Sequence, residues 1–228
     1  MHQFPLLITL TSLTQTAISM FITFEGLDFC GKSTQVSRVV ERLKHEGRSV
    51  LLVREPGGTA IGEKIRSILL DRKSIGMTEI SELMLFSASR AQLVAEVIRP
   101  ALEGGTVVVC DRFYDSTTAY QGWGRGIDRD AVQAINRTAT YGLIPDMTIF
   151  LDVHLGEIER RMRSSKAAKD RMESNERSFH ERVREGYMKL ARNESRFIVV
   201  DGEKPVDIIH EEIWNHMAKR LNRDSTHS

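Results

Sequence analysis

The chain has 228 residues, of which 41% are hydrophobic, so it is long enough for one domain with a sizeable core. Thirty-two basic residues against thirty-one acidic ones give a formal net charge of +1, which argues against a sequence-independent nucleic-acid binder. The two cysteines, Cys30 and Cys110, lie in or beside apolar segments and suggest neither a disulfide framework nor a metal site. We therefore expect a cytoplasmic protein whose partners are small molecules.

The first nineteen residues are apolar and rich in threonine, and they contain no Lys, Arg, Asp or Glu. A signal peptide needs a positively charged start, and a membrane span needs about eighteen consecutive apolar residues. Residues 1–19 have neither, so we expect no membrane attachment. We interpret them as a disordered extension, or as sequence upstream of a natural start at Met20, followed by a single domain over 20–228. A chain that starts at Met20 is then expected to keep full activity.

Residues 21–25 predict the first strand, which leads directly into residues 26–34, a match to G-x-x-x-x-G-K-[S/T]. In such a loop the backbone N–H groups turn inward on the phosphates of a nucleoside triphosphate, and the following helix adds its dipole. Lys32 would reach the β- and γ-phosphates, and the Ser33 hydroxyl would ligate Mg²⁺. The predicted triphosphate site is the whole loop: Gly26, Leu27, Asp28, Phe29, Cys30, Gly31, Lys32, Ser33 and Thr34.

Strands and helices alternate along the rest of the chain. Valines and a leucine at helical spacing over 36–43 predict a helix that stops near Gly47, and a similar stripe occupies 209–221. Four more β-branched runs are mostly apolar throughout, as strands buried on both faces are: 50–54, 106–111, 147–152 and 196–201. The alternation predicts an α/β protein, a three-layer α/β/α P-loop NTPase fold with a five-stranded parallel sheet.

Two segments depart from this alternation. The glycine-rich run 122–126 predicts a flexible, exposed loop, whereas residues 160–177 are dense in charge and poor in apolar residues. Such a charge run is usually a solvated helix face. Beside a phosphate loop, we interpret it as a mobile cationic lid over the nucleotide.

Charged residues also gather where the predicted strands end, among them Arg54, Asp111 and Arg112. In an open parallel sheet, ligands bind beyond the carboxyl ends of the strands. Each charge alone is explained by a surface salt bridge, but together they favour a binding site.

Six motifs, taken in order and spacing, resemble thymidylate kinase of the bacterial type from Met20 to about Leu221. They are the phosphate loop, Arg54-Glu-Pro-Gly-Gly-Thr59, Phe86-Ser-Ala-Ser-Arg90, Asp111-Arg112-Phe113, Ala119-Tyr-Gln-Gly122 and Asp170-Arg-Met-Glu173. The resemblance implies a homodimer packed through helices that phosphorylates dTMP to dTDP with ATP and Mg²⁺, in dTTP biosynthesis.

The resemblance also assigns roles at the acceptor site. Asp28 would hold the 3′-hydroxyl of dTMP, and Arg112 with Arg54 would clamp its 5′-phosphate, a task that suits bidentate guanidinium groups. Phe86 would stack on thymine while Arg90 reaches its O4, because their i, i+4 spacing places both on one helix face. The remaining assignments are Tyr120 against the 2′ position of the sugar, Thr117 and Gln121 near the base, and Asp111 as a Mg²⁺ ligand.

The catalytic cation is expected from the lid. Phe29 stands where one type of the family has a loop arginine, so this chain resembles the type whose lid supplies the positive charge. Arg163 and Arg171 are the candidates within a cluster that also contains Arg160 and Arg161. The turn 201–206 matches the place where these kinases hold the adenine of ATP, although a simple turn into the last helix explains it equally well.

Two other functions compete with this interpretation. One is another nucleoside monophosphate kinase or a deoxynucleoside kinase on the same fold, against which Arg90 and Tyr120 argue. The other is a nucleotide-dependent switch that hydrolyses slowly and makes no phosphorylated small molecule. It leaves Phe86, Arg90 and Arg112 unexplained.

Overall fold

The computed structural model describes residues 19–74, 76–165, 171–173 and 175–224. Within these ranges no helix is both long and apolar enough to cross a membrane. The expected extension, except for its last residue, and the centre of the expected lid lie outside the described residues.

Five parallel strands form the central sheet, in the order β2-β3-β1-β4-β5. Their bounds are β1 (Met20–Glu25), β2 (Val50–Arg54), β3 (Val107–Asp111), β4 (Met147–Asp152) and β5 (Phe197–Asp201). The predicted strands are confirmed, with β1 beginning one residue earlier than expected and β3 and β5 each beginning one residue later. The first strand in the chain is also the central one, with β3 on one side and β4 on the other.

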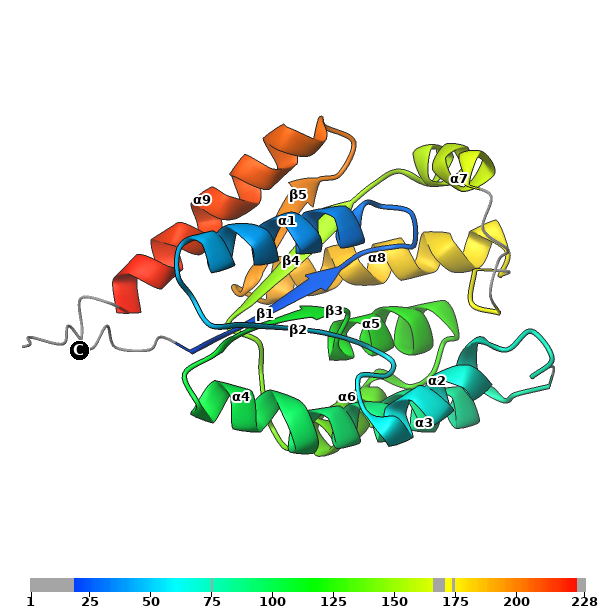
Figure 1. Cartoon of the computed structure of the whole chain (residues 1–228). Helices are drawn as coiled ribbons and strands as arrows, with labels where there is room; N and C mark the ends of the chain where they lie inside the picture. Colours follow the sequence, from blue (N-terminus) through cyan, green and yellow to red (C-terminus); the bar gives the residue numbers. More distant parts are fainter. Residues whose placement is uncertain (1–18, 75, 166–170, 174, 225–228) are drawn as a thin grey trace, which may run out of the picture.

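Helices cover both faces of this sheet, as the three-layer prediction requires (Figure 1). Figure 1 shows α1 and α9 on one side of the strands and the group from α2 to α6 on the other. The bounds are α1 (Lys32–His45), α2 (Ala60–Leu70), α3 (Glu79–Leu93), η1 (Val94–Ile98), α4 (Arg99–Glu103), α5 (Tyr114–Thr117), η2 (Thr118–Gly124), α6 (Arg129–Ala139), α7 (Leu155–Ser164), α8 (Arg177–Asn193) and α9 (Val206–Asp224).

The apolar periodicity explains how α1 and α9 pack. The predicted stripe on α9 is buried, with Ile213 and Met217 fully inaccessible. On α1, Val39 and Leu43 are fully buried in the same core, and the helix ends before Gly47, which adopts a φ of +76°. Both helical predictions are therefore confirmed.

The exposed loop predicted at 122–126 is wrong over its first three residues. These residues belong to η2, a π-helix, and Gly122 and Gly124 are buried. A Cβ atom on Gly124 would lie 2.6 Å from a ring carbon of Phe179 on α8. A Cβ on Gly186 of α8 would likewise lie 2.6 Å from the ring of Trp123. These glycines permit close packing of two helices, so their presence did not signal a loop.

Candidate active site

A cavity of about 530 Å³ opens where the strands end. Residues from the phosphate loop, the ends of β2 and β3, α3 and η2 all contribute to its wall. The cavity brings together these predicted residues: Asp28, Phe29, Gly31, Lys32, Ser33, Thr34, Arg54, Phe86, Arg90, Asp111, Arg112, Thr117, Tyr120 and Gln121. The other three loop residues, Gly26, Leu27 and Cys30, lie outside its lining.

The phosphate loop begins where the central strand ends. Gly26 adopts a φ of +138°, and a Cβ there would meet the Leu151 carbonyl oxygen at 2.7 Å, so only glycine fits. Lys32 is buried, and its Nζ donates to the carbonyl oxygens of Gly26 at 3.1 Å and Leu27 at 2.8 Å. The lysine is thereby held along the inner side of the loop.

Phe29 carries an unusual backbone within this loop. Its φ of +63° lies in the left-handed region, which costs a residue with a Cβ about 1–2 kcal/mol relative to glycine. Its side chain lines the main cavity and also a second one of about 290 Å³ beneath α7. The loop therefore retains an aromatic ring at its tip at a cost in backbone strain.

Ser33 and Asp111 bring two oxygen atoms that can ligate a metal close together. The Ser33 Oγ donates to Asp111 Oδ2 at 3.4 Å, and both residues line the cavity. Mg²⁺ prefers such hard oxygen ligands and keeps several water or phosphate ligands besides one or two from protein. No group of three or more His, Cys, Asp or Glu residues suited to a metal occurs in the described part of the chain. A hydroxyl and one carboxylate therefore fit Mg²⁺ shared with a nucleotide.

Arg112 links the phosphate loop to the acceptor side of the cavity. Its Nη2 donates to Asp28 Oδ1 at 2.6 Å, and its Nη1 donates to the Gly26 carbonyl at 2.8 Å. Burial alone would raise the pKa of Asp28, but the charges of Arg112 and Lys32 outweigh it and hold the pKa at about 2. The Tyr120 hydroxyl lies 3.5 Å from Asp28 Oδ2. Asp28 is thus an ionised acceptor at neutral pH.

Arg54, the second predicted clamp residue, is held differently. Its Nη2 pairs with Glu63 Oε2 at 2.9 Å, and its Nη1 donates to the Pro56 carbonyl at 2.7 Å. Its side chain is 45% exposed at the cavity rim. The guanidinium therefore has solvent on one side and room to change partner.

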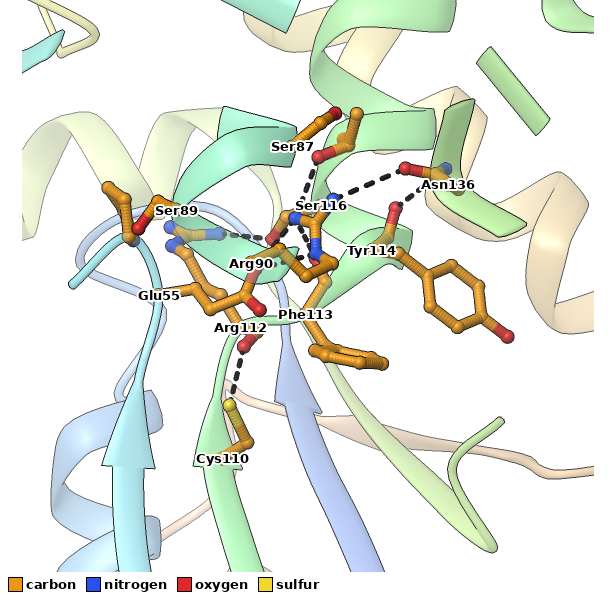
Figure 2. A network of polar contacts seen from close by, with 12 residues as sticks. Glu55, Ser87, Ser89, Arg90, Cys110, Arg112, Phe113, Tyr114, Ser116 and Asn136 are labelled. Atoms are coloured by element: carbon orange, nitrogen blue, oxygen red, sulfur yellow. Dashed lines mark hydrogen bonds and ion pairs between the residues drawn. The ribbon is translucent and has the colours of Figure 1, made fainter. Parts of the chain in front are cut away.

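Arg90 is the most completely buried cation of the site, at 1% exposure. Figure 2 shows the polar contacts around it. Its Nε and Nη2 contact Glu55 Oε2 at 2.8 and 2.7 Å. Its Nη2 also donates to Thr117 Oγ1 at 2.9 Å, and its Nη1 donates to Asn136 Oδ1 at 3.2 Å. These contacts fix the guanidinium plane in the cavity wall, four residues along α3 from Phe86.

Glu55 is an unusual partner for Arg90. Burial raises the pKa of the Glu55 carboxyl to about 7, although the Arg90 charge acts in the opposite direction. Its Oε1 is buried and has no hydrogen-bond partner among the described residues. Such an acceptor costs roughly 1–3 kcal/mol, so the cavity wall is built at the expense of stability.

The two lid candidates lie in different surroundings. Arg163 is exposed on α7 and lines the second cavity. Arg171 contacts α2 and α3, because its Nη1 pairs with buried Glu82 at 2.6 Å and its Nε donates to the Leu69 carbonyl at 2.7 Å. Gln121 also donates to Glu82, at 2.9 Å.

Arg161 is the α7 arginine that contacts the phosphate loop. Its Nη1 donates to the carbonyl oxygens of Phe29 at 3.4 Å and Cys30 at 3.2 Å. Its Nη2 donates to the Gly202 carbonyl at 2.9 Å, in the turn predicted to hold adenine. One guanidinium thus joins the helix, the phosphate loop and that turn.

The sequence profile of the thymidylate kinase family matches residues 24–213. The chain belongs to this family. A thymidylate kinase from Caldanaerobacter subterraneus subsp. tengcongensis is 46% identical over 202 residues, which cover 88% of this chain and 96% of that protein. One from Trichlorobacter lovleyi is 48% identical over 188 residues, which cover 80% of this chain and 89% of that protein. The crystal structure of the Ehrlichia chaffeensis thymidylate kinase superposes with a TM-score of 0.72 at 34% identity, covering 88% of this chain and 99% of that one.

Sequence reasoning missed several residues of this thymidylate kinase site because they act through other side chains. Glu55 lies inside a motif that gives no indication of its partner, and Asn136 and Glu82 carry no signal of their own. Arg90 lies 35 residues from Glu55 and 46 from Asn136 in the chain, and Arg171 lies 89 residues from Glu82. The one available signal was Arg90 on the same helix face as apolar Phe86, because a guanidinium buried beside apolar residues requires an acidic partner.

Proposed function

We propose that this chain is a thymidylate kinase of the cytoplasm that transfers the γ-phosphoryl group of ATP to the 5′-phosphate of dTMP, giving dTDP and ADP for dTTP synthesis. One observation carries the proposal. A single cavity holds the phosphate-loop Lys32 together with two fixed guanidinium groups, those of Arg112 and Arg90. Phosphoryl transfer requires this alignment of donor and acceptor sites.

At the donor side, the loop N–H groups and Lys32 bind the β- and γ-phosphates. The Lys32 ammonium exchanges its loop carbonyl partners for phosphate oxygens, which are stronger acceptors. Ser33 and Asp111 would hold Mg²⁺, which supplies positive charge to the β- and γ-phosphate oxygens when bound. The turn at 201–206 contacts the adenine, chiefly through its backbone.

At the acceptor side, Arg112 and Arg54 bind the 5′-phosphate of dTMP. Asp28 is ionised and accepts the 3′-hydroxyl, while Tyr120 crowds the 2′ position and so favours deoxyribose. The acceptor oxygen already belongs to an anion, so no general base is required.

Phe86 stacks on the thymine, and Arg90 donates to its O4 from the rigid position set by Glu55 and Asn136. Thr117 and Gln121 lie beside them and border the base.

The lid supplies the remaining positive charge. Arg163 and Arg171 were the candidates, and Arg161 joins them because it contacts the phosphate loop carbonyls. Such a cation contributes on the order of 10³ in rate. We propose that closure of 160–177 over ATP excludes water and thereby suppresses hydrolysis.

The protein is proposed to act as a homodimer packed through α2 and α3. These neighbouring helices leave four large apolar side chains about half exposed: Ile61, Ile68, Ile80 and Met84. A second copy of the chain is the partner that would cover them.

A coupled ADP-release assay with dTMP, dUMP, dCMP, dGMP and thymidine tests the activity. We expect dTMP to give the highest kcat/KM, and Lys32→Ala to lower kcat by several orders of magnitude. Preference for a different acceptor would identify another nucleotide or nucleoside kinase. ATP consumption with every acceptor omitted and no phosphorylated product would identify a switch.

A further inference from the structure

We propose that Glu25, acting through the hydroxyl groups of Ser116 and Tyr187, positions Arg112 for its contact with the acceptor phosphate. This inference rests on the proposed function, in which Arg112 binds the 5′-phosphate of dTMP. It assigns a role to three residues that no motif singled out.

Glu25 is the last residue of β1 and is fully buried directly before the phosphate loop. Its Oε1 accepts the Phe113 N–H at 2.8 Å. Its Oε2 accepts the Ser116 hydroxyl at 2.6 Å and the Tyr187 hydroxyl at 2.8 Å. One carboxylate therefore connects the central strand, the segment after β3 and helix α8.

The backbone of Arg112 needs such support. Its φ of +70° is a left-handed conformation that costs a non-glycine residue about 1–2 kcal/mol. The Arg112 N–H donates to the Phe24 carbonyl at 2.9 Å, and the Cys110 thiol lies 2.9 Å from the Arg112 carbonyl oxygen (Figure 2). Glu25 secures the next peptide by accepting the Phe113 N–H. The strained turn that aims Arg112 is thus fixed on both sides.

The same network orients the guanidinium group. Arg112 Nη1 donates to Ser116 Oγ at 3.2 Å and to the Tyr187 hydroxyl oxygen at 3.4 Å. Burial and the Asp115 charge raise the pKa of Glu25 to about 7, and in its ionised form Glu25 accepts the hydrogens of both hydroxyls, so that each presents a lone pair to Arg112. A carboxylate sets this direction, whereas an amide in its place would donate to one hydroxyl and reverse it.

Glu25 also carries a cost that packing alone leaves unexplained. It makes no salt bridge with any described residue, and a buried carboxylate without an ion-pair partner destabilises a fold. The neighbouring charges are Arg112 and buried Asp115, the latter already paired with Arg196 at 2.7 Å. An apolar residue would suit a purely structural position at the end of this strand better.

The test measures KM for dTMP, KM for ATP and kcat in Tyr187→Phe, Ser116→Ala and Ser116→Thr. Tyr187→Phe removes only the hydroxyl and keeps the ring, which stacks on Phe150 with 5.0 Å between the ring centroids. We expect Tyr187→Phe and Ser116→Ala each to raise KM for dTMP about tenfold, with KM for ATP unchanged. Ser116→Thr restores the hydroxyl and most of the affinity. Tyr141→Phe, at an exposed tyrosine, is the matched control and leaves all three constants unchanged.

Circular dichroism of each variant distinguishes a misfolded chain from a folded chain in which Arg112 is misplaced. If Tyr187→Phe does not fold, Ser116→Ala provides the test. An unchanged KM for dTMP in the folded variants, alongside a raised KM in Arg112→Ala, overturns this inference and leaves the proposed function intact. An unchanged KM in Arg112→Ala overturns both the clamp and the inference. A wild-type chain that makes no dTDP contradicts the proposed function itself.

Discussion

The guanidinium groups of the site are held by carboxylates before any substrate binds. Arg112 is paired with Asp28 at 2.6 Å and Arg90 with Glu55 at 2.7 Å. Fixed charges of this kind need little reorganisation when a phosphate or a carbonyl oxygen arrives. The two pairs differ in burial, because Asp28 borders the open cavity whereas Glu55 lies almost wholly in the core. Substrate can therefore reach the Arg112–Asp28 pair from the cavity, whereas the Arg90–Glu55 pair is a rigid part of the wall.

Substitution of Arg90 tests that rigid contact. Arg90→Ala is expected to raise KM for dTMP by about a hundredfold or more, since it removes the donor to O4 and leaves buried Glu55 without a partner. Loss of one member of a buried pair also lowers the free energy of unfolding by roughly 3–5 kcal/mol. Steady-state kinetics and urea unfolding measure the two effects. Arg137→Ala, at an exposed position on α6, serves as control, and an unaltered KM in Arg90→Ala would remove thymine recognition from this residue.

Glu55 predicts how stability depends on pH. Burial raises its pKa to about 7 from 4.5, so the folded state binds more protons than the unfolded state between these values. The contribution of Glu55 to the free energy of unfolding is fully present below pH 4.5 and is lost as the pH rises through 7. The total loss is roughly 3 kcal/mol. Urea unfolding of wild type and Glu55→Gln from pH 5 to 8 measures the slope of the free energy of unfolding against pH. The slope should be shallower in Glu55→Gln and unchanged in the exposed control Glu103→Gln; equal slopes in all three chains would contradict the assignment.

The sequence predicted which arginines belong to the site but not what holds them. Spacing placed Arg90 with Phe86 on one helix face, and the structure has both in the cavity wall. Glu55 and Asn136 become neighbours of Arg90 only after the sheet and the helices α3 and α6 have assembled. Such contacts depend on tertiary packing, which a local pattern does not encode.

At the scale of the element, hydrophobic periodicity was reliable for α1 and α9 because one face of each is buried. The loop predicted from the glycine-rich run 122–126 was wrong at η2, where small residues replace an apolar stripe. Trp123 lies over Gly186, and Phe179 lies over Gly124, so η2 and α8 each accept a ring from the other. Glycines are equally typical of loops and of close helix contacts, and only the partner helix distinguishes the two.

The contact between η2 and α8 gives a matched pair of substitutions. Gly124→Ala places a methyl group 2.6 Å from Phe179 and 2.9 Å from Val183, so we expect a loss of about 1–3 kcal/mol in the free energy of unfolding. In the same π-helix, a Cβ on Gly122 would meet its nearest neighbours at 3.9 and 4.0 Å. Gly122→Ala should therefore be tolerated. Urea unfolding measures both, and equal stability of the two variants would show that the packing is looser than described.

At the scale of the whole molecule, the strand order follows from rules that the sequence obeys. Right-handed crossovers between buried parallel strands, with the phosphate loop after the first, restrict the topology to few arrangements. The ends of the strands then bring the donor and acceptor residues to one edge of the sheet. The pattern does not encode which helix faces remain uncovered, because a side chain at a helix surface can face solvent or another subunit.

The uncovered faces of α2 and α3 lead to the proposed dimer. Ile61 and Ile68 lie seven residues apart on one helix, and Ile80 and Met84 lie four apart on the next, so each pair shares a helix face. Burial of apolar surface yields about 25 cal/mol per Å², and a charge placed inside it removes that gain. Ile80→Asp should therefore give a monomer in sedimentation equilibrium, whereas Ile144→Asp, at an exposed site elsewhere, keeps the wild-type mass. A monomeric wild-type chain, or a dimer that survives Ile80→Asp and Ile68→Asp together, would refute this interface.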